Sequence, residues 1–212
     1  MQKASLFDLQ LIAECHQKAF PNSVTTLLGK HFISEMFKWY LLVENRFLYC
    51  IIENEICMGY FGGYVVTPLE LSGSGSGMAQ SGFYAAVISI LKKPYLLFHP
   101  EIVKRYVFIC KNILFRIFYL FTKNRIANQL SVVSDLNARL VVIGVHPDFQ
   151  GKEIGSILIK KFEFVCNESQ VKTAGLSVHE DNKAAIHFYK KNGWKICGKN
   201  ELSLKMEKTL DQ

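Results

Sequence analysis

The segment 145–156 (VHPDFQGKEIGS) constrains the fold most, because it places a glycine-containing turn between an apolar strand and an amphipathic helix. Residues 140–145 (LVVIGV) form a continuous, mostly β-branched run, which predicts a strand buried on both faces and ended by Pro147. Apolar residues then recur at helical spacing from Ile154 onward. The first turn of such a helix has free backbone N–H groups, and Gly151 and Gly155 carry no side chain to keep a bulky anion away. The segment therefore predicts a binding site for a diphosphate.

The loop does not match the common nucleotide-binding patterns. Gly155 is followed by Ser156 and Ile157, which excludes the pattern G-x-x-x-x-G-K-[ST], and G-x-G-x-x-G also fails. The loop reads instead as V-x-P-x-x-Q-G-x-x-[IL]-G-S. A second segment, 182–194 (NKAAIHFYKKNGW), predicts a helix that Asp181 or Asn182 caps and Gly193 ends.

These two segments, in this order and at this spacing, resemble the acetyl-coenzyme A loop and the N-x-x-A-x-x-[FL]-Y-x-x-x-G-[FWY] motif of the GCN5-related N-acetyltransferase (GNAT) superfamily. The resemblance covers residues 140–194 closely and the rest of the chain in outline. It implies an α/β (α+β) fold: one GNAT-type domain with a central mixed, mostly antiparallel twisted sheet flanked by helices. It also implies an enzyme that transfers acetyl from acetyl-coenzyme A, its co-substrate, to a primary amine of a small molecule or an amino sugar, without a metal.

The resemblance further assigns roles to individual residues. The strand would offer its backbone to the pantetheine arm, and the loop amides would hold the diphosphate, while a tyrosine with a reference pKa of ~10 can protonate the departing thiolate. Tyr189 is thus the candidate catalytic general acid. The expected coenzyme-binding residues are Ile143, Val145, Gln150, Gly151, Lys152, Glu153, Ile154, Gly155, Ser156 and Asn182.

Glu153 departs from the family pattern, which has glycine at this position. A carboxylate near the start of a helix suits the helix dipole but repels a diphosphate if it points inward. We therefore expect Glu153 to face solvent and to leave its backbone N–H available.

The general base is not predicted. His146, His179 and His99 titrate in a suitable range, but histidines at such positions more often serve as structural hydrogen-bonding groups.

Length and composition favour a single domain. The chain has 212 residues, half of them hydrophobic, which suffices for one substantial core. Its first residues lack the basic start and apolar run of a secretory signal, and its six cysteines show no zinc-ligand spacing. We expect a cytoplasmic protein.

The net charge of +7 is concentrated in one segment. Residues 92–125 carry eight basic side chains and one acidic side chain, and the remainder of the chain is balanced. This segment belongs to a predicted aromatic-rich helical insertion at 72–129, between the third and fourth strands. Its part 101–123 has a basic helical sector with three interpretations: a helix packed on the sheet, a homodimer element, or a peripheral membrane contact. A transmembrane span and nucleic-acid binding are disfavoured.

The remaining pattern predicts the flanking elements. A helix is expected over 6–19 and a second one from Ser23 or Thr25 to Tyr40, followed by strands at 46–52 and 56–67 that a turn at 53–55 joins. Residues 171–179 and 195–206 are the later strands.

Two other functions are compatible with the same residues. One is a non-catalytic protein that binds acyl-coenzyme A, in which Glu153 marks a degenerate site. The other is a membrane-surface acyltransferase that acts on a nucleotide-linked or lipid-linked sugar.

Overall fold

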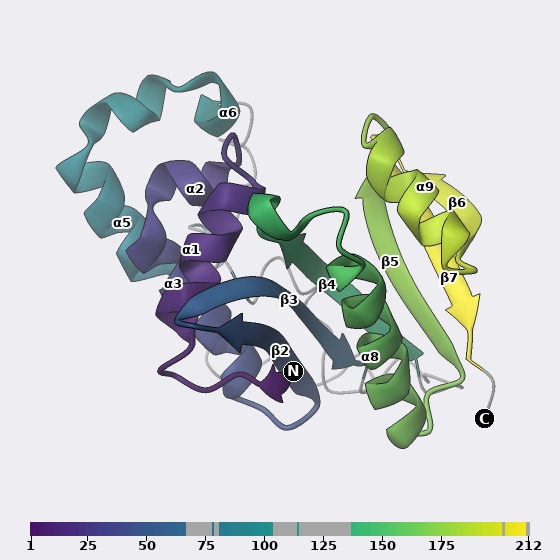
Figure 1. The fold of residues 1–212 in the computed structure, drawn as a ribbon. Helices are drawn as coiled ribbons and strands as arrows, with labels where there is room; N and C mark the ends of the chain where they lie inside the picture. The colour runs from purple at the N-terminus through teal and green to yellow at the C-terminus, as the bar shows by residue number, and fades with distance from the viewer. Residues whose placement is uncertain (67–77, 79–80, 104–113, 115–136, 201, 211–212) are drawn as a thin grey trace, which may run out of the picture.

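The computed structural model describes residues 1–66, 78, 81–103, 114, 137–200 and 202–210 (Figure 1). Its strands are β1 (Gln2–Lys3), β2 (Arg46–Glu53), β3 (Ile56–Val65), β4 (Asn137–Val145), β5 (Thr173–His179), β6 (Lys195–Asn200) and β7 (Ser203–Thr209). Its helices are α1 (Leu9–Ala19), α2 (Val24–Leu28), α3 (Lys30–Phe37), α5 (Phe83–Lys92), α6 (Pro100–Val103), α8 (Ile154–Glu168) and α9 (Lys183–Lys191), with 3₁₀ turns η1 (Lys38–Leu41), η2 (Pro94–Phe98) and η3 (Pro147–Phe149).

The strands form one seven-stranded sheet in the order β1-β2-β3-β4-β5-β7-β6. The pair β4–β5 is parallel, and the other neighbouring pairs are antiparallel. The helix α8 provides the crossover that a parallel pair requires. The predicted mixed, mostly antiparallel sheet with flanking helices is confirmed.

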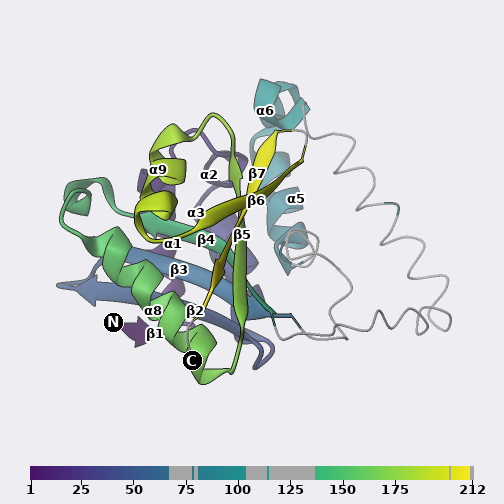
Figure 2. The same ribbon diagram turned by 90° about the vertical axis from the view of Figure 1, so that its right-hand side faces the viewer.

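Alternate side chains of the central strands build two cores on opposite faces of the sheet. Phe47 and Phe61 pack in the core that includes α8 and α9, whereas Leu48 and Tyr60 pack in the core that includes α1 and α3. This two-residue alternation is what a strand covered on both faces requires. Figure 2 shows α8 on one side of the sheet and α1 with α3 on the other.

Two expected elements differ in the structure. The helix predicted to run to Tyr40 is divided into α2, α3 and η1, because Gly29 adopts a φ of 96° that a continuous right-handed helix does not allow. The predicted strand 195–206 is two strands, β6 and β7, which pair antiparallel after the chain reverses between Asn200 and Ser203. The turn predicted at 53–55 is confirmed, and Asn54 and Glu55 both have positive φ there, as a tight hairpin requires.

The strands β4 and β5 pair over only part of their lengths. The parallel ladder joins residues 137–140 to residues 173–176 and stops at the pair Leu140 and Leu176. On the other edge of β4, the register with β3 shifts by one residue between Val142 and Leu140, which places a β-bulge at Val141. A bulge bends its strand and strengthens its twist. The two parallel strands therefore diverge beyond the bulge.

The predicted insertion 72–129 lies mostly outside the described residues, as does most of the basic sector 101–123. The part that is described contains α5, η2 and α6, which follow β3 and precede β4 in the chain (Figure 1). The boundaries of the insertion and its three interpretations stay predictions. Within the described residues, none of the helices has the length and apolar character that crossing a membrane requires.

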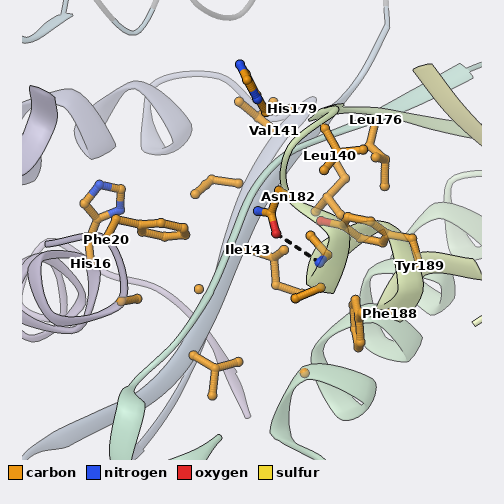
Figure 3. Close-up of a pocket in the computed structure, with 18 of the residues that line it drawn as sticks. His16, Phe20, Leu140, Val141, Ile143, Leu176, His179, Asn182, Phe188 and Tyr189 are labelled. Atoms are coloured by element: carbon orange, nitrogen blue, oxygen red, sulfur yellow. Dashed lines mark hydrogen bonds between the residues drawn. The ribbon is translucent and has the colours of Figure 1, made fainter. Parts of the chain in front are cut away.

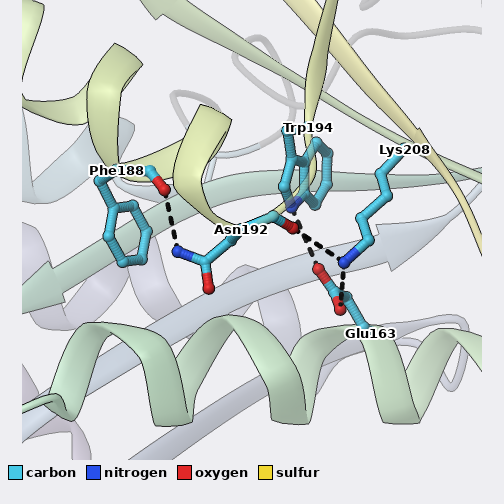
Figure 4. Close-up of polar contacts among 5 residues, drawn as sticks. All are labelled: Glu163, Phe188, Asn192, Trp194 and Lys208. Atoms are coloured by element: carbon cyan, nitrogen blue, oxygen red, sulfur yellow. Dashed lines mark hydrogen bonds and ion pairs between the residues drawn. The ribbon is translucent and has the colours of Figure 1, made fainter.

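A polar cluster fixes the end of α9 against α8 and β7 (Figure 4). The buried Trp194 donates its indole N–H to Glu163 Oε1 (3.1 Å), and Lys208 pairs with Glu163 Oε2 (2.8 Å). Lys208 also donates to the carbonyl of Asn192 (2.9 Å), where α9 ends. The carboxylate therefore joins three elements that flank the diverging strands.

We predict that Glu163→Gln destabilises the protein by about 1–3 kcal/mol, because it leaves the half-buried ammonium of Lys208 without a counter-charge. Urea unfolding followed by circular dichroism measures the change. The matched control is Glu168→Gln, which neutralises an exposed carboxylate on the same helix and is expected to change stability by less than about 0.5 kcal/mol. Equal effects of the two substitutions would contradict the assigned role of Glu163.

Candidate active site

A cavity of about 750 Å³ opens where β4 and β5 diverge (Figure 3). One wall is β4 from Leu140 to Val145, and the facing wall is β5 from Leu176 to His179. The loop before α8 and one face of α9 close one side, and α1 with the start of α2 closes the other. A cavity of this size suits a cofactor-sized ligand.

The loop before α8 presents a row of free amides. The N–H groups of residues 151–156 donate no backbone hydrogen bond within the described chain. Gln150 is different, because its N–H donates to the carbonyl of Pro147 (3.1 Å) and closes the turn η3. Amides at a helix start attract anions through their own dipoles and the helix dipole. The free amides of the loop thus begin at Gly151, one residue after the first residue that the sequence assigned to the diphosphate.

The backbone conformation at Glu153 is one that glycine adopts more easily than other residues. Its φ is 61°, in the left-handed region where a residue with a side chain costs roughly 1–2 kcal/mol. Its side chain is exposed, as expected from the sequence. The carboxylate therefore faces solvent, although its charge lies beside the free amides of the loop.

The helix α9 contributes Asn182 and Tyr189 to the cavity. Asn182 is the N-cap, and its side-chain oxygen accepts from the amide of Ala185 (3.0 Å), as Figure 3 shows. Gly193 ends the helix with a φ of 85°, as predicted. Tyr189 is buried, and burial raises the pKa of its phenol to about 12. The phenol is therefore protonated throughout the physiological range.

The cavity brings together most of the residues that the sequence assigned to the site. Ile143, Val145, Gln150, Gly151, Gly155, Asn182 and Tyr189 all line it. Lys152, Glu153, Ile154 and Ser156 are not among the lining residues. The side chain of Ile154 packs in the core instead, so this residue can offer only its amide.

The histidines considered from the sequence are dispersed. His179 lines the cavity at the end of β5 and is exposed, whereas His146 is buried beside Phe149 and does not line it. His99 lies between η2 and α6 and is also not a lining residue. Within the described residues, no cluster of histidine, cysteine, aspartate or glutamate could hold a metal ion.

Sequence reasoning missed the residues on the far side of the cavity. His16 from α1, Phe20 directly after it, and Ser23 and Thr25 at the start of α2 line this side. Figure 3 shows His16 and Phe20. One signal was present in the sequence, because His16 follows Ile12 and Ala13 at helical spacing and therefore belongs to the buried stripe of its helix. A polar residue on such a stripe needs partners.

His16 has a hydrogen-bond partner on each ring nitrogen. Its Nδ1 lies 2.5 Å from the hydroxyl of Tyr60, and its Nε2 lies 2.7 Å from the hydroxyl of Thr25. Burial lowers the pKa of His16 to about 4, because the charged imidazolium loses its hydration. The imidazole is therefore neutral at physiological pH.

Comparison with protein families gives a match over residues 115–194 to the model described as the acetyltransferase (GNAT) family. This range ends at Trp194 and includes the loop and the α9 motif. No curated protein sequence matches the chain.

Solved structures with the same fold span nearly the whole chain. The PaiA N-acetyltransferase from Thermoplasma acidophilum in complex with coenzyme A is 13% identical, with a TM-score of 0.54, and the match covers 98% of this chain and 96% of that chain. The ribosomal-protein-S18-alanine N-acetyltransferase from Escherichia coli is 13% identical, with a TM-score of 0.56 and coverage of 100% and 93%. An N-acetyltransferase from Staphylococcus aureus Mu50 is 14% identical, with a TM-score of 0.56 and coverage of 99% and 97%. At these identities the likeness concerns the fold.

We predict that Glu153→Gln strengthens coenzyme A binding roughly two- to five-fold, since removing a charge beside a helix start is worth about 0.3–1 kcal/mol. Glu153→Gly should give the same gain and should also stabilise the free protein by about 1 kcal/mol, because it relieves the left-handed backbone. Isothermal titration calorimetry and urea unfolding measure the two effects separately. Unchanged affinity in both variants would show that the carboxylate does not act on the diphosphate.

We predict that acid destabilises the protein through His16. The folded-state pKa of His16 is about 4 and the unfolded value is 6.5, so only the unfolded chain takes up the proton between these values. Stability is therefore complete above pH 6.5, and ~3 kcal/mol is lost as the pH falls to about 4.

Urea unfolding of His16→Gln at a series of pH values tests this, because the variant should lose most of the pH dependence in that window. The control His31→Gln removes an exposed histidine and should keep it. A wild-type stability that stays flat from pH 6.5 to 4 would contradict the assignment.

Proposed function

We propose that the chain is an acyltransferase of the GNAT type, which transfers acetyl from acetyl-coenzyme A to the primary amine of a small molecule or an amino sugar; the family match over residues 115–194 and the shared fold support this. One observation carries this proposal. Motif residues from β4, the loop before α8, and α9 line a single cavity, and that cavity continues to the α1–α2 side, where an acceptor can enter.

The coenzyme is held mostly by the main chain in this proposal. The diphosphate accepts hydrogen bonds from the amides of residues 151–156. The pantetheine arm lies along β4 beyond Leu140, where β5 no longer pairs with this edge of the strand. An extended chain with amide groups can add to such an edge as another strand would. Asn182 contacts the coenzyme from α9.

Acetyl transfer then proceeds by direct attack. The neutral amine nitrogen forms a bond to the thioester carbon, the carbonyl oxygen becomes an oxyanion, and the amide at Val145 donates to it. The carbon–sulfur bond breaks, and Tyr189 donates a hydrogen bond to the departing sulfur. The proton that the amine loses balances the one that the thiolate gains.

The raised pKa of Tyr189 limits how this residue can act on the departing sulfur. A value of about 12 exceeds that of a cysteine thiol, ~8.5, by about 3.5 units, so complete proton transfer to the sulfur would cost ~5 kcal/mol. Tyr189 therefore stabilises the developing thiolate by a hydrogen bond and donates its proton only as it regains one from the acceptor nitrogen.

We further propose a reducing compartment, the cytoplasm, for this activity. The described cysteines, Cys15, Cys50, Cys57, Cys166 and Cys197, all carry free thiols, and four of them are buried. This pattern is typical of proteins kept reduced inside the cell.

We predict that Tyr189→Phe lowers kcat at least about 100-fold, because general-acid donors contribute roughly 10²–10⁴ to rate. The assay is thiol release from acetyl-coenzyme A with a panel of small primary amines and amino sugars. Tyr49→Phe is the matched control, since Tyr49 packs on Phe61 away from the cavity lining and should keep full activity.

Full activity in Tyr189→Phe would remove this residue from its role. Coenzyme A binding by calorimetry, without thiol release on any amine, would favour the non-catalytic binder instead.

A further inference from the structure

A chain of hydrogen bonds runs through the acceptor side of the cavity and joins β3, α1 and α2. It begins at the buried hydroxyl of Tyr60, passes through both nitrogens of His16, and reaches the hydroxyl of Thr25. Thr25 Oγ1 lies 2.7 Å from Ser23 Oγ, and Ser23 donates to Thr26 Oγ1 (3.0 Å). The hydroxyl of Thr26 then donates to the carbonyl of Phe20 (2.8 Å).

The direction of the first two bonds follows from Tyr60. Its hydroxyl is fully buried and contacts His16 Nδ1 as its one hydrogen-bond partner among the described residues. A buried hydroxyl that fails to donate carries a desolvation cost of about 1–3 kcal/mol. Tyr60 therefore donates to Nδ1. Because the imidazole is neutral, its proton is on Nε2, and Nε2–H donates to Thr25.

The hydrogen bonds of Ser23 determine which hydroxyl donates in the contact between Thr25 and Ser23. Its oxygen accepts from the amide of Thr26 (3.2 Å) and donates to the hydroxyl of Thr26, so one lone pair remains. Thr25 must fill that position with its own proton. A hydroxyl has one proton and two lone pairs. Thr25 thus donates to Ser23, accepts from His16, and keeps one lone pair.

We propose that Thr25 Oγ1 accepts a hydrogen bond from an N–H of the acceptor amine, and that His16 is a positioning residue that fixes this acceptor-only state. This inference rests on the proposed function. The hydroxyl of Thr25 cannot turn to donate, because His16 and Ser23 occupy its other positions. The amine nitrogen consequently presents its proton to Thr25 and its lone pair elsewhere, toward the thioester.

The chemistry of the surrounding wall narrows the acceptor class. Ala19 and Phe20 line the same cavity as Thr25 and come from the end of α1, so we expect the carbon next to the reacting nitrogen to meet apolar surface. The site thus fits an amine with at least one N–H and a hydrocarbon flank, and it offers nothing to a tertiary amine. His16 does not act as the general base, because an imidazole with so low a pKa is a poor proton acceptor from an ammonium.

The first part of the test needs no turnover. Nitrogen NMR of the full-length protein with ¹⁵N-labelled histidine reports which nitrogen of His16 carries the proton, with His16→Gln identifying the signal. We expect the neutral Nε2–H form from pH 6.5 to 8. An Nδ1–H form or an imidazolium in this range would overturn the hydrogen-bond direction and with it the inference.

The second part measures the Michaelis constants of both substrates. We expect Thr25→Val, which keeps the shape and removes the hydroxyl, to raise KM for the amine about five-fold and to leave KM for acetyl-coenzyme A unchanged, since one hydrogen bond is worth ~1 kcal/mol. Thr25→Ser restores the hydroxyl and should lie close to the wild type. Thr173→Val, a half-buried β5 threonine away from the cavity lining, is the matched control and should match the wild type.

The outcomes separate the two claims. Thiol release with an unchanged amine KM in Thr25→Val overturns this inference and leaves the proposed function in place. An equal rise of both Michaelis constants would show a general disturbance of the site and also overturn it. Absence of thiol release from the wild type with every amine overturns the proposed function, and the acceptor role of Thr25 with it.

Discussion

The separation of β4 from β5 is the constraint on which the rest of the site depends. Two parallel strands that paired along their whole lengths would close the cavity, because ladder hydrogen bonds hold neighbouring backbones less than about 5 Å apart. Here the ladder ends at Leu140 and Leu176, and the bulge at Val141 lies at the same level. The unpaired edge of β4 provides one wall of the cavity, and the C-terminal end of β5 provides the other. The cavity therefore lies where the ladder of hydrogen bonds between β4 and β5 ends.

The elements around this opening are held by contacts that lie away from it. Glu163, Trp194 and Lys208 fix the end of α9 against α8 and β7, so the face that carries Asn182 and Tyr189 is positioned from behind. Close packing positions the loop in the same way. A side chain at Gly59 would come within 2.9 Å of Ile154, so the first residue of α8 sits directly on β3. The packing of Ile154 on β3 thus fixes the position of the loop amides.

Much of the site could be predicted from local sequence, and the parts that could not depend on tertiary contacts. The turn within 145–156 and the capped helix within 182–194 could be predicted, because caps, glycine conformations and helical periodicity are local properties. The break at Gly29 was missed because its apolar pattern continues through it, and the hairpin β6–β7 because no proline or glycine marks its turn. The bulge at Val141 depends on register with β3. The partners of His16 come from β3 and α2, 44 and 9 residues away, so no window of sequence contains them.

Gly144 connects the β4 wall of the cavity to the wall formed by α1 and α2. It lines the cavity on β4, and a Cβ atom there would lie 2.6 Å from the ring of Tyr60, whose hydroxyl holds His16. Any larger residue at 144 would displace the ring of Tyr60 toward α1. Because His16 bonds to both Tyr60 and Thr25, this displacement would also move the hydroxyl of Thr25. If β4 binds the coenzyme as proposed, a substitution on this strand would then alter selection among amines. Variation at this one backbone position thus offers a route by which acceptor preference can drift without any substitution in the helices that face the acceptor.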